Sequence, residues 1–291
     1  MTPPADDSDS LRREIDEIDD RLHRTLMERA ELMQRIVAAS RNRAANDDGN
    51  AVFIRPGREA EMLRRRLSEH NGSMPAAVVA RVWRELIGAA GQQQEPLRVL
   101  VHAPAKSVGY WDLARNHFGS VARMSMHTSA QRVLTDVAEG DGAVGMLTLP
   151  EENEPNPWWP HIMGGDEARL QVIARLPFFA SATGRFEDLA ALVVAPFAPE
   201  ESGDDISLIA IQASDLSRAR VGDLLAGAGF DGRIISSFDP GHGADRLHLV
   251  EIPGYVSKTD PRIEALAQAS EKEIQRVVAL GAYALPLGQL D

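Results

Sequence analysis

An arginine stands inside an apolar stripe near the N-terminus. Apolar residues recur there at steps of three, four or seven, the period of a helix with one apolar side, and Arg29 falls on that stripe between Leu26 and Met33. A guanidinium in such a place either extends to solvent or pairs with an anion. Because guanidinium groups are planar forks that suit carboxylates, the second interpretation predicts a carboxylate-binding site.

Two other polar residues of this segment can be placed around the helix axis. At about 100° per residue, Ser40 projects within about 20° of Arg29, three turns further on. Arg12 points about 100° away from Arg29, so one small ligand cannot touch both side chains of the same helix. That ligand could reach Arg12 of a second, antiparallel copy of the helix.

Later segments add further polar groups. Arg58 and Glu59 are adjacent at the start of a second helical segment, and Gln94 follows the apolar side of a third. Together with Arg29, they predict a cavity inside a helical dimer, lined by arginines, a glutamate and an amide. Each residue also has a structural interpretation, as an ion-paired arginine, a charged helix start or a solvated helix end.

Three helices must position these groups. The spacing predicts helices over 9–43, 58–67 with Pro56 in the first turn, and 76–94, with loops over 44–53 and 70–75. The first helix would be about 50 Å long, too long for one small globule. Three such helices make a weak bundle alone and a good one if two chains interlock.

From residue 97 the apolar period becomes that of strands. We predict strands near 97–102, 121–126, 142–149, 170–176 and 190–195, with helices near 109–118 and 129–139. This alternation indicates a small α/β lobe with some parallel pairing. Residues 153–165 form a loop rich in proline and tryptophan, and 197–205 form an acidic linker.

The last segment has a compact order of its own. We predict strands over 206–213, 232–238, 246–252 and 275–285, with one helix over 217–229 and a second over 260–269. This β-α-β-β-α-β order is ferredoxin-like. The predicted fold class is therefore multidomain α plus α/β, with a three-helix bundle over 8–95, an α/β lobe over 96–197 and a ferredoxin-like domain over 204–286.

Composition excludes several classes of function. The 291-residue chain has a net charge of −12, which argues against nucleic acid or an anionic membrane as a partner. Cysteine is absent, so disulfides, thiolate catalysis and Cys-ligated metals are excluded. The start MTPPADDSD has no apolar core of a signal peptide, and no run of about 18 apolar residues occurs, so we expect a cytoplasmic protein. No HExxH, GxGxxG or P-loop motif occurs, so we expect no metal and no cofactor.

The order of three sequence elements points to a known family. LRREIDEIDDRLHRTLMERAEL, AVFIRPGREAEMLRR and ARVWRELIGAAGQQQEPLRV closely resemble the all-helical chorismate mutase domain, as found at the front of bifunctional chorismate mutase–prephenate dehydratases. The resemblance covers residues 10–96. It implies an intertwined homodimer formed through the N-terminal helices, with chorismate and prephenate as its small-molecule partners.

The resemblance also implies a role for each polar residue. Arg12 is similar to the arginine that reaches across the dimer into the substrate site of the partner chain. Arg29 and Arg58 are similar to the clamps on the two substrate carboxylates. Glu59 corresponds to the acceptor for the ring hydroxyl, and Gln94 to the amide beside the ether oxygen.

One position departs from the family. The family has a lysine where this chain has Ser40, beside the ether oxygen of the bond that breaks. The implied reaction, chorismate to prephenate, is an intramolecular Claisen rearrangement that depends on positioning and fixed charge. No lysine precedes Lys106, so only an arginine could supply the missing charge, and Arg41 or Arg43 is about one turn away.

The second half resembles the rest of the bifunctional enzyme in a degenerate, truncated form. LRVLVHAPAKSVGYWDLARNHFG and GAVGMLTLPEEN resemble prephenate dehydratase elements, but the GPxGTF and Thr-Arg-Phe motifs are missing, which predicts no dehydratase activity. The tail is similar to an ACT domain. Where that family has its ligand motifs GAL and ESRP, this chain has ARV (219–221) and SSFD (236–239). Two alternatives remain: an isochorismate-pyruvate lyase, and a catalytically weak regulatory or ligand-sensing dimer.

Overall fold

The computed structural model describes most of the chain. It covers residues 5–47, 54–94, 97–104, 109–140, 142–152, 154–164, 169–181, 189–214, 216–241, 243–268 and 273–290, apart from the side chains of 5–7, 40–47 and 92–94. These residues fall into two compact units, Met1–Phe53 and Ile54–Asp291, and each is described by itself.

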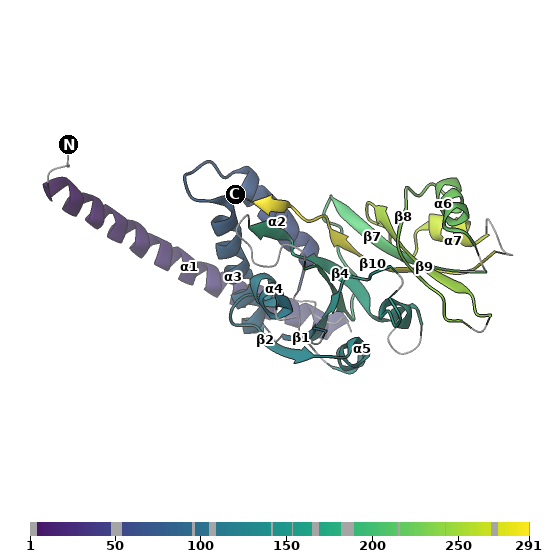
Figure 1. Cartoon of the computed structure of the whole chain (residues 1–291). Coiled ribbons are helices and arrows are strands. Elements are labelled where there is room, and N and C mark those ends of the chain that lie inside the picture. Colours follow the sequence, from purple (N-terminus) through teal and green to yellow (C-terminus); the bar gives the residue numbers. More distant parts are fainter. Residues whose placement is uncertain are drawn as a thin grey trace. The chain divides into compact units, whose positions relative to one another are not determined.

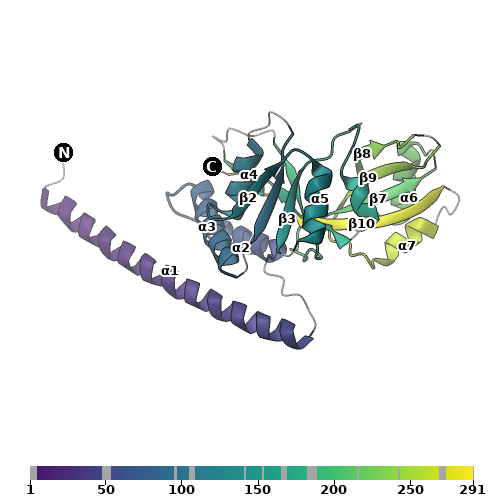
Figure 2. The same ribbon diagram turned by 90° about the horizontal axis from the view of Figure 1, so that it is seen from below.

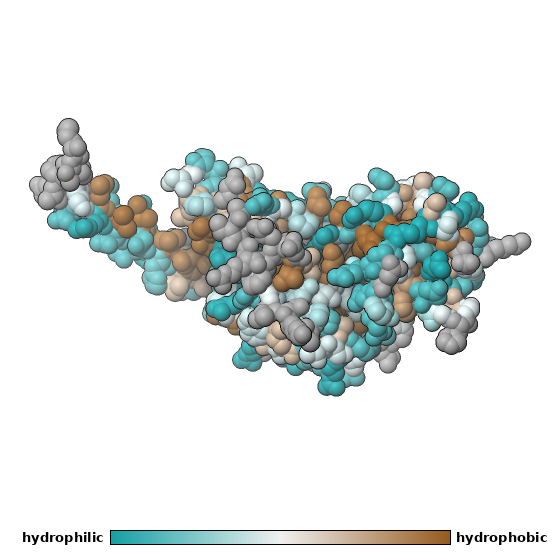
Figure 3. Space-filling view, in the orientation of Figure 1, coloured by the Kyte–Doolittle hydropathy of each residue, from teal (hydrophilic) through white to brown (hydrophobic). Residues whose placement is uncertain are grey.

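The first unit contains a single helix, α1 (Ala5–Asp47), whose 43 residues make it about 65 Å long. The predicted helix over 9–43 is thus confirmed, and it continues through 44–47, where a loop was predicted; the rest of that loop, 48–53, lies outside the described residues. Figure 3 shows apolar residues gathered along one side of α1. Four large members of this stripe are each more than half exposed: Leu11, Ile15, Ile18 and Leu22.

The second unit begins with two helices, α2 (Pro56–Ser68) and α3 (Ala76–Gln94), as predicted. Pro56 suits the first turn of α2, where a backbone N–H would have no partner within the helix. Ala60 and Leu63 of α2 are buried in a small apolar cluster together with Phe178 and Ala284. The helices α2 and α3 therefore pack on the α/β part of the chain through a core of their own.

A nine-stranded sheet forms the centre of this unit, in the order β2-β1-β3-β6-β4-β10-β7-β9-β8 (Figures 1 and 2). Its strands are β1 (Arg98–His102), β2 (Arg123–His127), β3 (Ala143–Thr148), β4 (Gln171–Leu176), β6 (Ala191–Ala195), β7 (Asp205–Ala213), β8 (Arg233–Phe238), β9 (Arg246–Pro253) and β10 (Ile274–Ala284). A separate pair, β5 (Phe179–Ser181) and β11 (Gly288–Leu290), and a 3-10 helix, η1 (Trp159–Met163), were not predicted from the sequence.

Two helices cover opposite faces of the first part of the sheet. Strands β1, β2 and β3 pair in parallel, and β6 runs antiparallel between β3 and β4. Val99 and Val101 of β1 pack in the cluster that contains residues of α4 (Gly109–Phe118). Leu100 packs instead with residues of α5 (Ala130–Glu139), because successive strand residues point to opposite faces. The predicted α/β alternation is confirmed.

The last part has the predicted β-α-β-β-α-β order. Strands β7, β8, β9 and β10 are joined through α6 (Arg218–Gly227) and α7 (Pro261–Gln268), and every neighbouring pair among these strands is antiparallel. Both helices pack on one face of these four strands. The order β10-β7-β9-β8 is that of a ferredoxin-like sheet.

One close contact joins the two parts of the sheet. Strands β10 and β4 pair in parallel at Gly281 and Val172. A Cβ atom on Gly281 would lie 2.1 Å from the carbonyl oxygen of Val172, and Gly281 has a φ of 132°, which favours glycine. The segments predicted as separate domains over 96–197 and 204–286 therefore share one sheet, and Gly281 is the residue that lets them meet.

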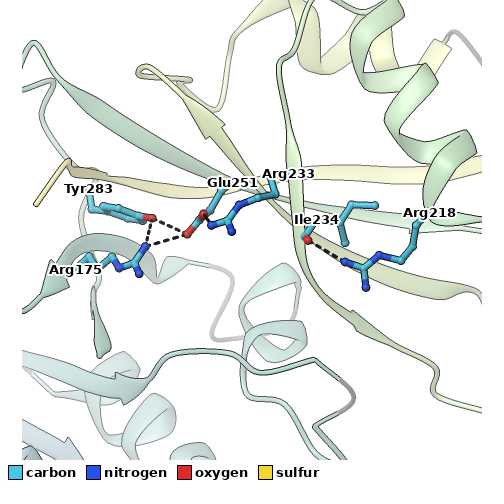
Figure 4. Close-up of polar contacts among 6 residues, drawn as sticks. All are labelled: Arg175, Arg218, Arg233, Ile234, Glu251 and Tyr283. Atoms are coloured by element: carbon cyan, nitrogen blue, oxygen red, sulfur yellow. Dashed lines mark hydrogen bonds and ion pairs between the residues drawn. The ribbon is translucent and has the colours of Figure 1, made fainter. Parts of the chain in front are cut away.

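A buried polar network reinforces this junction (Figure 4). Glu251 of β9 accepts hydrogen bonds from Arg175 of β4 (3.2 Å), from the hydroxyl of Tyr283 of β10 (2.8 Å) and from Arg233 of β8 (2.6 Å). Burial, followed by the charge of Glu251, raises the pKa of Tyr283, which therefore stays protonated and can donate. The network ties β4 to three strands of the last part.

The predicted acidic linker is packed rather than free. The Ser202 backbone N–H and hydroxyl both donate to the Asp205 carboxylate, at 2.8 and 2.6 Å. Glu200 accepts a hydrogen bond from Arg55 at 2.7 Å, and the hydroxyl of Tyr255 donates to the carbonyl of Pro199. The segment connects two parts of the sheet, as predicted, and it also contacts the start of α2.

We expect Gly281→Ala to destabilise the protein strongly. The added Cβ meets backbone atoms of Val172, which cannot move without breaking the pairing of β4 with β10. Thermal unfolding followed by circular dichroism should show a loss of more than about 3 kcal/mol. Gly222→Ala is the control, because nothing lies within 4 Å of its added Cβ in α6, and it should change stability by about 1 kcal/mol or less. Equal melting temperatures for the two variants would contradict the role given to Gly281.

Candidate functional site

Three of the predicted site residues lie on α1. Arg12 is exposed and forms an ion pair with Asp9, one turn earlier, at 3.1 Å. Arg29 is partly buried, and Ser40 lies further along the same unbroken helix, with its side chain outside the described part. An unbroken helix keeps the angular relation predicted for Arg29 and Ser40.

The other predicted residues lie on α2 and α3. Arg58 is exposed in the first turn of α2, and Glu59 follows it with 19% of its side chain exposed. Gln94 is the last residue of α3, and its side chain lies outside the described part. The structure thus describes α2 and α3 together within one unit, whereas the residues of α1 belong to the other unit.

Glu59 is held by a residue that the sequence reasoning missed. Nη1 of Arg84, on α3, donates to Oε2 of Glu59 at 3.0 Å, and only 3% of the Arg84 side chain is exposed. Burial lowers the pKa of Arg84, and the charge of Glu59 and its hydrogen bond act in the opposite direction. Arg84 remains charged because an arginine does not lose its proton in a protein. The pair is therefore a buried salt bridge that orients one oxygen of Glu59.

An aromatic ring packs on the other side of Arg84. Its Cζ lies 5.3 Å from the ring centroid of Phe178, which is within the range of a cation–π contact. The same ring has the Cζ of Arg64 at 5.8 Å. Arg64 in turn donates to the carbonyl oxygens of Ser202, Asp204 and Leu285. These bonds fasten α2 to the α/β part, and Arg84 contacts both Phe178 and Glu59.

The buried face of α3 differs from the predicted one. We predicted a core side formed by Val79, Val82, Trp83, Leu86, Ile87 and Ala90. In the structure Val82 is 51% exposed, whereas Ala80 and Arg84 are buried. Gly88 lies four residues after Arg84, and a Cβ there would be 2.2 Å from the carbonyl oxygen of Phe118. The lack of a side chain at Gly88 lets the end of α4 approach closely. Small residues four positions before and after Arg84 are the signal that could have identified it as buried.

A histidine of α4 lies close enough to Arg84 to be affected by it. Desolvation, followed by the charge of Arg84, holds the pKa of His117 well below its usual range. His117 is therefore neutral at physiological pH and does not compete with Arg84 for the carboxylate of Glu59.

The arrangement on α2 and α3 can bind a polar ligand. Glu59 is an ionised acceptor that a buried guanidinium holds in place, and Arg58 beside it is an exposed cation able to pair with a carboxylate. A hollow of about 360 Å³ lies elsewhere in this unit, lined by Pro160, His161, Met163, Gly164, Gln212, Leu247 and Arg276. None of the predicted site residues lines it.

The family of the N-terminal segment follows from comparison with known proteins. The family model described as chorismate mutase type II matches residues 11–95. Residues 11–95 are a chorismate mutase domain. The match contains Arg12, Arg29, Arg58, Glu59 and Gln94, and it confirms the resemblance predicted from the sequence.

Curated relatives extend this similarity beyond the chorismate mutase domain. The chain is 30% identical over 144 residues to a bifunctional chorismate mutase/prephenate dehydratase of Pseudomonas aeruginosa. This alignment covers 50% of this chain and 38% of the relative. It is 31% identical over 152 residues to the protein of the same description from Stutzerimonas stutzeri, covering 51% and 40%. Both alignments are longer than the chorismate mutase domain. This chain therefore spans about two fifths of the length of these relatives.

Similar solved structures share little sequence with this chain. A protein described as GqqA, a novel type of quorum quenching acylase, has a TM-score of 0.48 and 14% identity over 65% of this chain and 95% of its own. Prephenate dehydratase from Streptococcus mutans has a TM-score of 0.44 and 12% identity over 64% and 97%. Likeness at this level says nothing about the reaction of this chain. Within the described residues, no helix combines the length and apolar character needed to cross a membrane.

We expect Glu59→Ala to be more destabilising than Glu59→Gln. Alanine leaves the charge of Arg84 buried and unpaired, at a cost of about 3–5 kcal/mol, whereas glutamine keeps an oxygen that can accept from it. Urea unfolding measures both. Glu61→Ala, at an exposed glutamate of the same helix, is the control and should stay within about 0.5 kcal/mol of the wild type. If both Glu59 variants match this control, the buried pair does not stabilise the fold.

Proposed function

We propose that the chain is a homodimeric chorismate mutase, which converts chorismate to prephenate for the synthesis of phenylalanine and tyrosine. The observation that carries this proposal is the family match over residues 11–95, which includes the predicted site residues. The proposed mutase domain is 8–95. The proposal includes a cytoplasmic location, which the amino-acid composition supports.

The proposed mechanism uses fixed charge and positioning alone. The rearrangement makes one bond and breaks one within a single molecule, so it needs neither a nucleophile nor a proton transfer. In this proposal Arg29 and Arg58 pair with the two carboxylates of chorismate, and Arg12 reaches in from the partner chain. Glu59 accepts a hydrogen bond from the ring hydroxyl, and Gln94 donates to the ether oxygen as the bond to it breaks.

The proposed dimer has physical support in α1. This helix carries a stripe of large apolar side chains that are more than half exposed, including Leu11, Ile15, Ile18 and Leu22. Fully burying one such side chain stabilises a protein by about 1.5–3 kcal/mol. A second copy of α1, with its own stripe, provides the surface that would cover these residues and bring Arg12 of one chain to Arg29 of the other.

We further propose that the rest of the chain has lost the second activity of its relatives. Residues 96–197 form a prephenate dehydratase-like lobe without the GPxGTF and Thr-Arg-Phe motifs, and residues 204–286 an ACT-type domain. The observed β-α-β-β-α-β order supports the second assignment. The missing GPxGTF and Thr-Arg-Phe motifs support the first.

Chorismate consumption by the purified chain tests the proposed activity. We expect turnover by the wild type and a loss of at least about 100-fold in kcat/KM for Arg29→Ala, because a carboxylate clamp is removed. Arg24→Ala is the matched control, since Arg24 is an exposed arginine of the same helix outside the proposed site. No turnover above the uncatalysed rate would favour the regulatory or ligand-sensing alternative. Faster turnover of isochorismate than of chorismate would favour a lyase.

The serine at position 40 generates a separate prediction. If Arg41 or Arg43 supplies the charge that a lysine gives in the family, Arg41→Ala or Arg43→Ala lowers kcat by about 10²–10³. Adding Ser40→Lys to the impaired variant should then restore most of the rate, because it returns a cation to the ether oxygen. Unchanged rates in both single variants would exclude this compensation.

A further inference from the structure

Arg84 has no part in the proposed mechanism so far, yet it forms a salt bridge with Glu59 of the proposed site. We infer that Arg84 is a positioning residue, which the ring of Phe178 holds in place so that Glu59 is oriented to accept the substrate hydroxyl. The inference rests on the proposed mutase function. It adds a connection through which the α/β part of the chain acts on the site.

The geometry at Glu59 leaves one oxygen available. Nη1 of Arg84 donates a hydrogen bond to Oε2 of Glu59 at 3.0 Å. Oε1 has no hydrogen-bond partner among the residues that the structure describes. One oxygen is therefore anchored and the other is directed by that anchor, which is the arrangement required of a carboxylate that accepts one hydrogen bond from a ligand.

Arg84 is itself fixed from the α/β part. Phe178 is 5% exposed, and its ring centroid lies 5.3 Å from the Cζ of Arg84. The carbonyl oxygen of Phe178 accepts a hydrogen bond from the backbone N–H of Leu287 at 2.7 Å. Its side chain packs against Leu63 of α2 and Ala284 of β10. Because these contacts fix Phe178, its ring leaves the guanidinium of Arg84 little freedom to move away from Glu59.

The charged groups around the pair favour a single arrangement. Arg58 on α2 is exposed, whereas Arg84 on α3 is buried. His117 on α4 stays neutral because desolvation and the charge of Arg84 lower its pKa. Phe178, from the turn between β4 and β5, adds no charge. Arg84 is thus the one buried cation that neutralises Glu59 within the described residues of these elements.

Steady-state chorismate kinetics test the inference on the whole chain. Arg84→Gln removes the cation, so we expect kcat to fall by about 10- to 100-fold, as for a site group displaced by about 1 Å. KM should change less than kcat, because Arg29 and Arg58 still pair with the substrate carboxylates. Arg84→Lys keeps the charge beside Glu59, so it should restore most of the wild-type kcat.

Phe178→Leu tests the connection to the α/β part without changing any charge. We expect kcat to fall several-fold with KM changed less, since substrate carboxylates still meet their arginines. Phe230→Leu is the matched control: the ring of Phe230 is equally buried and carries the guanidinium of Arg262 at 4.6 Å, away from the proposed site. It should leave kcat unchanged.

The outcomes separate this inference from the function on which it rests. A wild type without turnover overturns the proposed function and the role of Arg84 together. A wild type that turns over chorismate while Arg84→Gln keeps its kcat overturns the positioning role alone. If Arg84→Gln does not fold, Phe178→Leu decides: a kcat equal to that of Phe230→Leu contradicts the inference, and a loss beyond that of Phe230→Leu supports it.

Discussion

The close approach of β10 to β4 is the constraint on which the second unit depends. At Gly281 the backbone of β10 passes so near Val172 that no side chain fits between them. This contact joins a lobe of mainly parallel strands to an antiparallel sheet and makes them one body. Beyond Gly281, Ala284 shares an apolar cluster with Phe178 and residues of α2, and the backbone N–H of Leu287 donates to the carbonyl of Phe178. Packing at the sheet junction thus reaches the helices that carry the proposed site.

The electrostatics of α2 and α3 follow from that packing. A guanidinium as buried as that of Arg84 is costly unless a carboxylate and a packed surface compensate for its lost water. Glu59 supplies the carboxylate, and Phe178 supplies the surface. In the proposed enzyme the carboxylate then has two tasks, since it neutralises Arg84 through one oxygen and accepts the substrate hydroxyl through the other. Its stabilising and catalytic roles are therefore coupled.

The helix α1 differs from the rest of the chain in the exposure of its apolar side chains. Its apolar side chains gather on one face, and many of them are exposed. The Glu251 network and the core around Trp158 and Trp159, in contrast, lie within the second unit. The proposed dimer and the proposed substrate would together account for a long amphipathic helix with an arginine in its apolar stripe.

Local pattern was enough to predict most elements and the family. Apolar periods of 3.6 and 2 depend only on neighbouring residues, so the long helix through Arg29, the strands and the β-α-β-β-α-β order followed from the sequence. The three-residue strands β5 and β11 were missed because they are too short to show a period. Tertiary structure alone decided that the two predicted α/β domains share a sheet, and that Arg84 holds Glu59. Both depend on residues far apart in the chain, Gly281 with Val172 and Arg84 with Phe178, whose meeting no local spacing records.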